Sequence, residues 1–110
     1  MTLRTDKLAS LIKRELGRIL LSEGYGESDG LLTITDVSVT ADLSEAKVGI
    51  SVIGRDARGV LKILNQNIYQ IQGELNRHLV LRKFPRIIFA IDDRGQVAEK
   101  INKLIDASGT

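Results

Sequence analysis

The basic side chains of this sequence are concentrated in two blocks. They are its best candidates for functional residues, and their chemistry suits phosphate binding. Residues 1–22 carry five basic and two acidic side chains, and residues 54–90 carry seven basic and two acidic ones. Residues 23–53 carry six acidic side chains against one basic. Because the charge changes sign in blocks along a small chain, we expect the folded protein to present one positive face that can meet phosphates.

Three groups of cations could form this face. The first falls within an arc of about 80° on a predicted helix, at about 100° per residue. The second shares one side near the start of another predicted helix, where the helix dipole also favours phosphate. The third surrounds the turn into the last predicted strand. The groups are Arg4, Lys7, Arg14 and Arg18; Arg55, Arg58 and Lys62; and Arg77, Arg82 and Lys83, with Arg86 beside them. Each group could also be an ordinary solvated surface.

Catalysis has little to build on in this sequence. His78 is the only histidine and cysteine is absent, so neither a metal site nor a histidine relay is indicated. Asp92 and Asp93 are adjacent, so their side chains would diverge on a strand or cap a helix. The sequence also lacks a glycine-rich loop of the nucleotide-binding kinds. We therefore predict a protein that is not an enzyme and that requires no metal or cofactor.

The first element that must position the cations is an amphipathic helix from Arg4 to Leu21, followed by a glycine-rich connection at 23–30. Its apolar residues recur at helical spacing: Leu8, Leu11, Ile12, Leu16, Ile19 and Leu20. Next, Leu31–Val39 and Ala46–Ile53 are rich in Val, Ile and Thr, and a short polar turn separates them. This pattern predicts an antiparallel hairpin.

Turn chemistry and pairing explain the polar residues of this hairpin better than catalysis does. Asp42 and Ser44 are residues typical of tight turns. Lys47 would project from the polar face of the second strand, near three carboxylates at Asp36, Asp42 and Glu45. We expect Lys47 to form a structural salt bridge with one of them.

A second helical pattern begins after Asp56, which can cap it, and continues to about Leu81. The polar cluster at 65–67 predicts a kink or break there. Pro85 stops the pattern, and Ile87–Ile91 predicts a third strand that is buried on both faces or nearly so. Asp93 and Gln96 resemble a capping box before a short closing helix with Val97, Ile101, Leu104 and Ile105 on one side.

The predicted order is helix, strand, strand, helix, helix, strand, helix, which gives an α+β domain with helices packed on a three-stranded sheet. Up to the third strand, this order is the one found in KH-type RNA-binding domains of the type II arrangement. A chain of 110 residues with 43% hydrophobic content can bury one core but not two, so we expect one domain over 1–110 with an ordered core at about 4–105.

The stretch Ile34–Gly54 resembles the central signature of the ribosome-binding factor A family. Its most distinctive part is Asp42-Leu43-Ser44 followed by Ala46-Lys47-Val48. The opening Arg4–Ala9, the strand region Pro85–Asp92 and the closing Ile101–Ile105 also resemble the family in order and spacing. The similarity therefore covers nearly the whole chain.

The sequence departs from the family pattern at two places. The glycine-rich Gly24–Gly30 replaces the usual Asp-Pro-Arg element before the first strand. The family's Ala-x-Gly at the interhelical kink falls on Asn67, Ile68 and Tyr69, and asparagine tolerates unusual backbone angles. Like the family, the chain lacks the Gly-x-x-Gly loop with which other KH domains hold a nucleic-acid strand.

The resemblance implies binding to the immature small (30S) ribosomal subunit and its 16S rRNA, near the decoding region. It also implies assistance in late processing of the rRNA precursor, including cold adaptation. We expect a cytoplasmic protein, because cysteine is absent and no apolar run is long enough to span a membrane. We also expect it to be monomeric when free. Two alternatives stay open: a module that docks on ribosomal proteins or other assembly factors, with RNA contact incidental, and a small nuclease.

Overall fold

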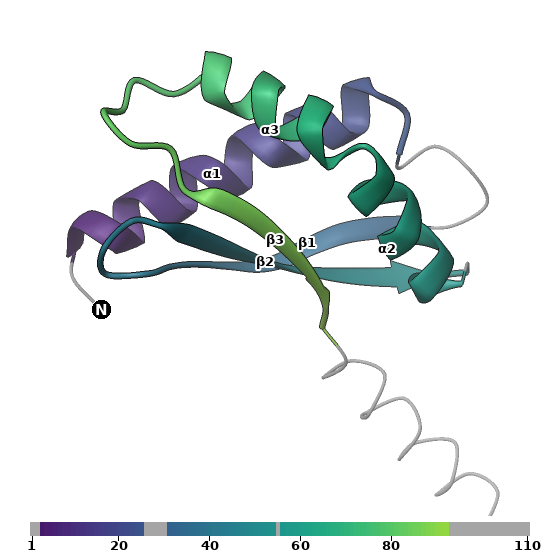
Figure 1. Cartoon of the computed structure of the whole chain (residues 1–110). Coiled ribbons are helices and arrows are strands. Elements are labelled where there is room, and N and C mark those ends of the chain that lie inside the picture. Colours follow the sequence, from purple (N-terminus) through teal and green to yellow (C-terminus); the bar gives the residue numbers. More distant parts are fainter. Residues whose placement is uncertain (1–2, 26–30, 55, 93–110) are drawn as a thin grey trace, which may run out of the picture.

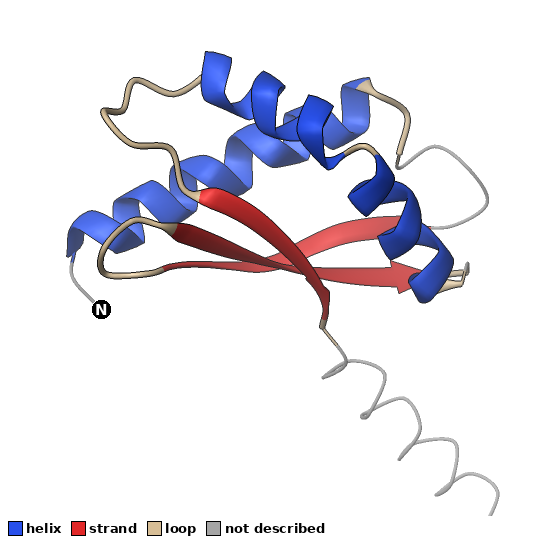
Figure 2. Cartoon of the chain, viewed as in Figure 1, coloured by secondary structure: helices blue, strands red, loops and turns tan. Residues whose placement is uncertain are grey.

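The computed structural model describes residues 3–25, 31–54 and 56–92, which form one sheet covered by helices (Figures 1 and 2). The elements in chain order are α1 (Leu3–Ser22), β1 (Leu31–Val39), β2 (Glu45–Ile53), α2 (Ala57–Gln66), α3 (Ile68–Arg77) and β3 (Arg86–Ile91). This order confirms the α+β, KH-like fold expected from the sequence. The predicted closing helix from Asp93 onward lies outside the described residues.

The sheet has the order β1-β2-β3, with β1 and β2 antiparallel and β2 and β3 parallel. The three described helices lie on the same face of the sheet (Figure 2). Side chains therefore alternate along β2, with Ala46, Val48, Ile50 and Val52 buried beneath the helices and Lys47 exposed on the other face. The opposing surface of the core comes from the apolar side of α1 and from the buried residues of α2 and α3.

A β-bulge interrupts the hairpin at Thr35. Ile34 pairs with Ile50, but the next pair is Asp36 with Gly49, so Thr35 is an extra residue in β1. Its Oγ1 lies 2.7 Å from the point that a Cβ on Gly49 would occupy, which explains the glycine. The same hydroxyl is buried and has no hydrogen-bond partner in the described part of the chain.

Asn67 separates α2 from α3, which confirms the break expected at 65–67. Its backbone has φ −109° and ψ 12°, so the break needs no left-handed residue. The Asn67 side-chain amide donates to the Ile63 carbonyl oxygen at 2.8 Å, and the Asn67 backbone amide donates to the same oxygen at 3.2 Å, so Asn67 closes the last turn of α2 with two bonds. Ile68 and Tyr69 of the expected kink already belong to the first turn of α3.

The second helical region ends at Arg77 and not near Leu81. The amides of His78 and Leu79 donate to Leu75 and Asn76, so the last turn tightens before the chain leaves the helix. The side chains of Leu79 and Leu81 still reach the core, but from a loop. The spacing of these two leucines therefore continues the helical pattern in the sequence, although the residues are not helical.

The third strand is covered on one face only. Ile87 and Phe89 are buried, whereas Ile88 and Ala90 are partly exposed. The expectation of burial on both faces is wrong, because β3 is an edge strand and the described helices lie on one side of the sheet.

Candidate nucleic-acid interface

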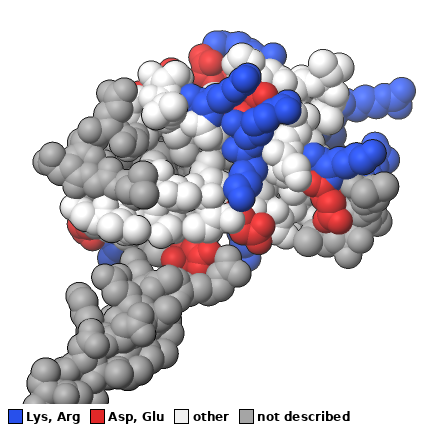
Figure 3. All heavy atoms as spheres, turned by 180° about the vertical axis from the view of Figure 1, so that it is seen from behind, with Lys and Arg blue, Asp and Glu red and all other residues white. Residues whose placement is uncertain are grey.

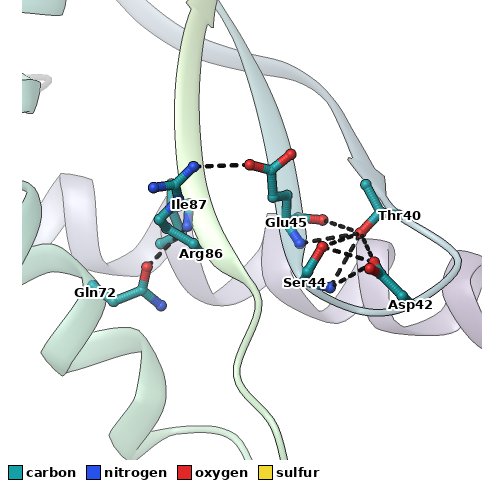
Figure 4. A network of polar contacts seen from close by, with 7 residues as sticks. All are labelled: Thr40, Asp42, Ser44, Glu45, Gln72, Arg86 and Ile87. Carbon is teal, nitrogen blue, oxygen red and sulfur yellow. Dashed lines mark hydrogen bonds and ion pairs between the residues drawn. The ribbon is translucent and has the colours of Figure 1, made fainter.

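The β1–β2 turn is a closed network of short polar side chains (Figure 4). Asp42 Oδ1 accepts from the hydroxyls of Ser44 and Thr40 at 2.7 and 2.8 Å and from the Ser44 amide at 3.1 Å. These bonds lower the pKa of Asp42 to about 2, with the Ser44 hydroxyl the largest cause. Leu43 has φ 61°, so the network stabilises an uncommon backbone conformation. The turn residues are structural, as the sequence predicted.

The salt bridge expected at Lys47 is not found, because its strand partners are Ser38 and Ile88 and none of the ion pairs among the described residues includes it. Glu45 pairs instead with Arg86, its partner across the parallel strands, at 2.8 Å (Figure 4). Arg86 is therefore less available to phosphate than its exposure suggests.

Gln72 joins α3 to the start of β3 (Figure 4). The amide of Ile87 donates to Gln72 Oε1 at 2.9 Å, and Gln72 Nε2 donates to the Pro85 carbonyl at 3.1 Å and to Asn76 Oδ1 at 3.0 Å. One side chain thus occupies two backbone groups on the free edge of β3 and fixes the loop between α3 and β3. No pattern in the sequence indicated this role.

Carboxylates neutralise part of the expected basic surface. On α1, Arg14 and Arg18 lie 3.4 and 3.9 Å from Glu15, whose side chain is only 9% exposed. On α3, Arg77 pairs with Glu74 at 2.8 Å. These arginines were predicted to contact RNA as free cations, and the structure gives each of them a partner.

The remaining candidates are exposed, and none has a carboxylate within ion-pair distance among residues 3–25, 31–54 and 56–92. They are Arg4 and Lys7 on α1, Arg58 and Lys62 on α2, and Arg82 and Lys83 in the α3–β3 loop. Lys83 donates to the Asp42 carbonyl oxygen at 3.5 Å, and its charge also helps to lower the pKa of the Asp42 carboxyl group, although the two form no ion pair. Arg55, the other candidate, lies outside the described residues.

The exposed side of α2 combines charge with amides. Arg58 and Lys62 line a shallow depression together with Leu61, Asn65 and Gln66. Asp56 Oδ1 accepts from the Arg58 amide at 3.2 Å, so a carboxylate already lies at the N-terminus of α2. Its negative charge weakens the attraction of the helix dipole for phosphate, and Arg58 and Lys62 remain the groups best placed to bind one.

A groove of about 690 Å³ runs between α3 and β3, next to the α2 depression. Asn65 borders both hollows, and Ile68, Tyr69 and Ile88 supply apolar walls to the groove. Tyr69 is 92% exposed, which is unusual for an aromatic residue of this size. Sequence analysis placed Tyr69 at the kink only and did not connect it with β3.

The cations do not form the single face expected from the sequence. In Figure 1, the start of α1, the β1–β2 turn and the α3–β3 loop lie at one end of the molecule, and α2 lies at the other. Seen from the back, Figure 3 shows Lys and Arg in a band across the middle and at the end where α1 begins, with Asp and Glu among them. The structure brings Arg4, Lys7, Arg82 and Lys83 to the same end and separates them from Arg58 and Lys62.

Other kinds of site find no support in the described part of the chain. No three side chains of His, Cys, Asp or Glu are grouped there in a way that could hold a metal ion. His78 is exposed at the end of α3. Among the described helices, none has the length and apolar character needed to cross a bilayer.

These features define an α+β, KH-like domain with two exposed basic surfaces. The chain matches the model of the family "Ribosome-binding factor A" over residues 4–105, and it belongs to that family. It is similar to ribosome-binding factor A of Akkermansia muciniphila, with 36% identity over 107 residues that cover 96% of this chain and 85% of the relative.

A crystal structure and a model fitted into a map have the same fold as this chain. The crystal structure of ribosome-binding factor A from Thermus thermophilus matches with a TM-score of 0.70 and 24% identity, over 79% of this chain and 94% of that one. A homology model of the Thermus thermophilus factor, fitted into an electron cryo-microscopy map of a 30S–RbfA complex, matches with a TM-score of 0.65 and 22% identity. That match covers 76% of this chain and 90% of the other.

Proposed function

We propose that this protein binds the immature small ribosomal subunit through its 16S rRNA and assists late maturation of the particle in the cytoplasm. The observation that carries the proposal is that six of the cations predicted to bind RNA are exposed and have no carboxylate partner among the described residues, in a member of the ribosome-binding factor A family. The relative fitted into a 30S complex supports the choice of particle. No cofactor is needed for this function.

The mechanism is a shift of populations. Binding free energy that is available in only one arrangement of the rRNA favours that arrangement, and the factor leaves when the mature particle no longer offers it. Such a step would help precursor processing most at low temperature, where wrongly paired rRNA rearranges slowly. The family resemblance suggests this role in the cold.

Charge reversal on α2 tests the rRNA contact. Arg58→Glu with Lys62→Glu should release the protein from small subunits in gradient sedimentation and leave its melting temperature unchanged. Lys13→Glu with Lys47→Glu changes the net charge equally at other exposed sites and should keep attachment. Attachment that resists both high salt and the α2 reversal would refute the electrostatic contact.

Loss of the gene tests the role in maturation. We expect precursor small subunits with unprocessed 16S rRNA ends to accumulate, more strongly in the cold. Complementation with the wild-type chain should restore the profile, and the α2 double variant should not. A normal particle profile at all temperatures would count against the proposal.

Docking on a protein is a second candidate, and the groove between α3 and β3 is the observation that favours it, because it exposes apolar walls and Tyr69. Tyr69→Ser should then weaken attachment to whole small subunits but not to naked precursor rRNA. If the wild-type protein binds naked rRNA and Tyr69→Ser behaves like wild type on both, docking on a protein is excluded.

A further inference from the structure

Two groups of cations that have no carboxylate partner among the described residues lie at opposite ends of β2. The end group consists of Arg4, Lys7, Arg82 and Lys83, and the α2 pair consists of Arg58 and Lys62. Lys83 contacts the Asp42 carbonyl just before β2 begins, and α2 starts just after β2 ends. β2 has nine residues and so spans about 30 Å. This separation exceeds the screening length of about 8 Å at physiological salt, so the groups act as independent anion sites.

The cations between the groups are partly paired. Arg14 and Arg18 share one carboxylate, that of Glu15, and Arg77 pairs with Glu74. Lys13 on α1 is exposed and has no carboxylate partner among the described residues, whereas Lys47 lies on the opposite face of the sheet. The cations without a described carboxylate partner are therefore concentrated at the two groups, with Lys13 between them.

Both groups are held on rigid elements. Arg58 and Lys62 lie one turn apart on α2, which packs on β2 and β3. The α3–β3 loop is anchored by buried Leu79 and Pro85 at its ends, by the bond from Gln72 to the Pro85 carbonyl and by Lys83. The distance between the groups is therefore fixed by the fold.

We propose that one molecule of this protein binds two separate RNA segments at the same time, one at the end group and one at the α2 pair, and so holds them at a set separation. The proposal rests on the RNA binding proposed above and adds a specific consequence. The protein would stabilise a particular rRNA arrangement by bridging its parts, because the second segment binds intramolecularly once the first is held.

Energy transfer between two RNA molecules tests the bridge. The probes are two RNA hairpins, each too short to span about 30 Å, one with a donor dye and one with an acceptor. Wild-type protein should produce energy transfer, and sedimentation should show two hairpins on one protein molecule. Excess protein should abolish the transfer, because each hairpin then occupies its own protein.

Variants at each group separate bridging from binding. Arg58→Glu with Lys62→Glu and, separately, Arg82→Glu with Lys83→Glu should each keep one bound hairpin and lose energy transfer. If a variant still binds the second hairpin weakly, the slope of log affinity against log salt for that hairpin should be lower than in the wild-type chain, by roughly one unit per phosphate contact removed. Lys13→Glu with Lys47→Glu should keep the transfer.

Several outcomes would overturn the bridge. The first is a stoichiometry of one hairpin per protein at saturating RNA. The second is energy transfer that arises only from complexes with two protein molecules. The third is loss of all RNA binding in either variant that changes one group. If the wild-type chain binds neither hairpin nor precursor rRNA, the proposed function fails as well. If it binds precursor rRNA and one hairpin, only the bridge fails.

Discussion

Gln72 accepts a hydrogen bond from the Ile87 amide at 2.9 Å, across fifteen positions of sequence, and so ties α3 to the free edge of β3. The side-chain nitrogen of Gln72, Nε2, donates a hydrogen bond to the Pro85 carbonyl oxygen. Removing the side chain would leave two partly buried backbone groups without a partner, and one unmade hydrogen bond of this kind costs about 1–3 kcal/mol.

Gln72→Ala should therefore lower the free energy of unfolding by about 2 kcal/mol. Chemical denaturation measures this loss, with Gln70→Ala as the control because Gln70 is exposed on the same helix. Equal stability of the two variants would show that water replaces the Gln72 amide without cost.

Gly49→Ala should destabilise the hairpin, because the added Cβ meets Thr35 Oγ1 at 2.7 Å and a β-branched side chain cannot easily turn away. A loss of about 1–3 kcal/mol in the free energy of unfolding is expected. Thr35→Ala should recover part of it in the double variant, since it removes a buried hydroxyl that has no described partner. Additive effects of the two substitutions would argue against direct contact.

Asn67→Ala should cost about 1 kcal/mol through loss of the bond to the Ile63 carbonyl, while the break between α2 and α3 persists. Asn67→Gly should be no more stable than the alanine variant, because φ is negative at this position. Thermal unfolding ranks the variants, and exchange protection of the Ile71 amide, bonded to the Asn67 carbonyl, reports whether the first turn of α3 stays formed. A glycine variant above wild type would contradict the observed backbone angles.

Acid should loosen the β1–β2 turn through Asp42. Its pKa is lowered to about 2 in the folded chain, so the carboxylate contributes stability that is present above the unfolded value near 4. This contribution is lost as the pH falls from about 4 to about 2. Asp42→Asn should therefore have a weaker dependence of stability on pH in that window, as measured by urea titrations, and the same dependence above pH 5. An unchanged profile below pH 4 would exclude Asp42 as the titrating group.

Glu15→Gln should increase the affinity for RNA, because Arg14 and Arg18 lose their carboxylate partner. The slope of log affinity against log salt should steepen by up to roughly two units if both arginines then reach phosphates. Filter binding to precursor rRNA at several salt concentrations measures both the affinity and this slope. Glu74→Gln, which frees only Arg77, is the graded comparison. An unchanged slope would show that these arginines face away from the RNA.

Local patterns in the sequence predicted most of the elements. The apolar spacing of Leu8, Ile12 and Leu16 predicted α1, and the polar cluster around Asn67 predicted the helix break. Both signals lie within a few residues of the feature they indicate. The end of α3 was misjudged because buried Leu79 and partly buried Leu81 pack against the core from a loop and so imitate a helical period.

The site was less predictable because its state depends on residues far apart in sequence. Whether Arg86 is free depends on Glu45, forty-one positions away, through the parallel register of β2 and β3. The division of the cations into two groups follows from where α2 lies relative to α1. Charge counts along the chain contain no information about either relationship.

The bulge at Thr35 also bears on whether the sheet can pair with another molecule. β1 is an edge strand, and an uninterrupted edge offers its amides and carbonyls to the edge of another molecule. The extra residue breaks that repeat, and Lys13 donates to the Thr35 carbonyl at 3.4 Å, which places a charge beside the same edge. The sheet is thereby protected from growing into an aggregate on that side, and substitutions that flatten the bulge should first become visible as precipitation at high protein concentration.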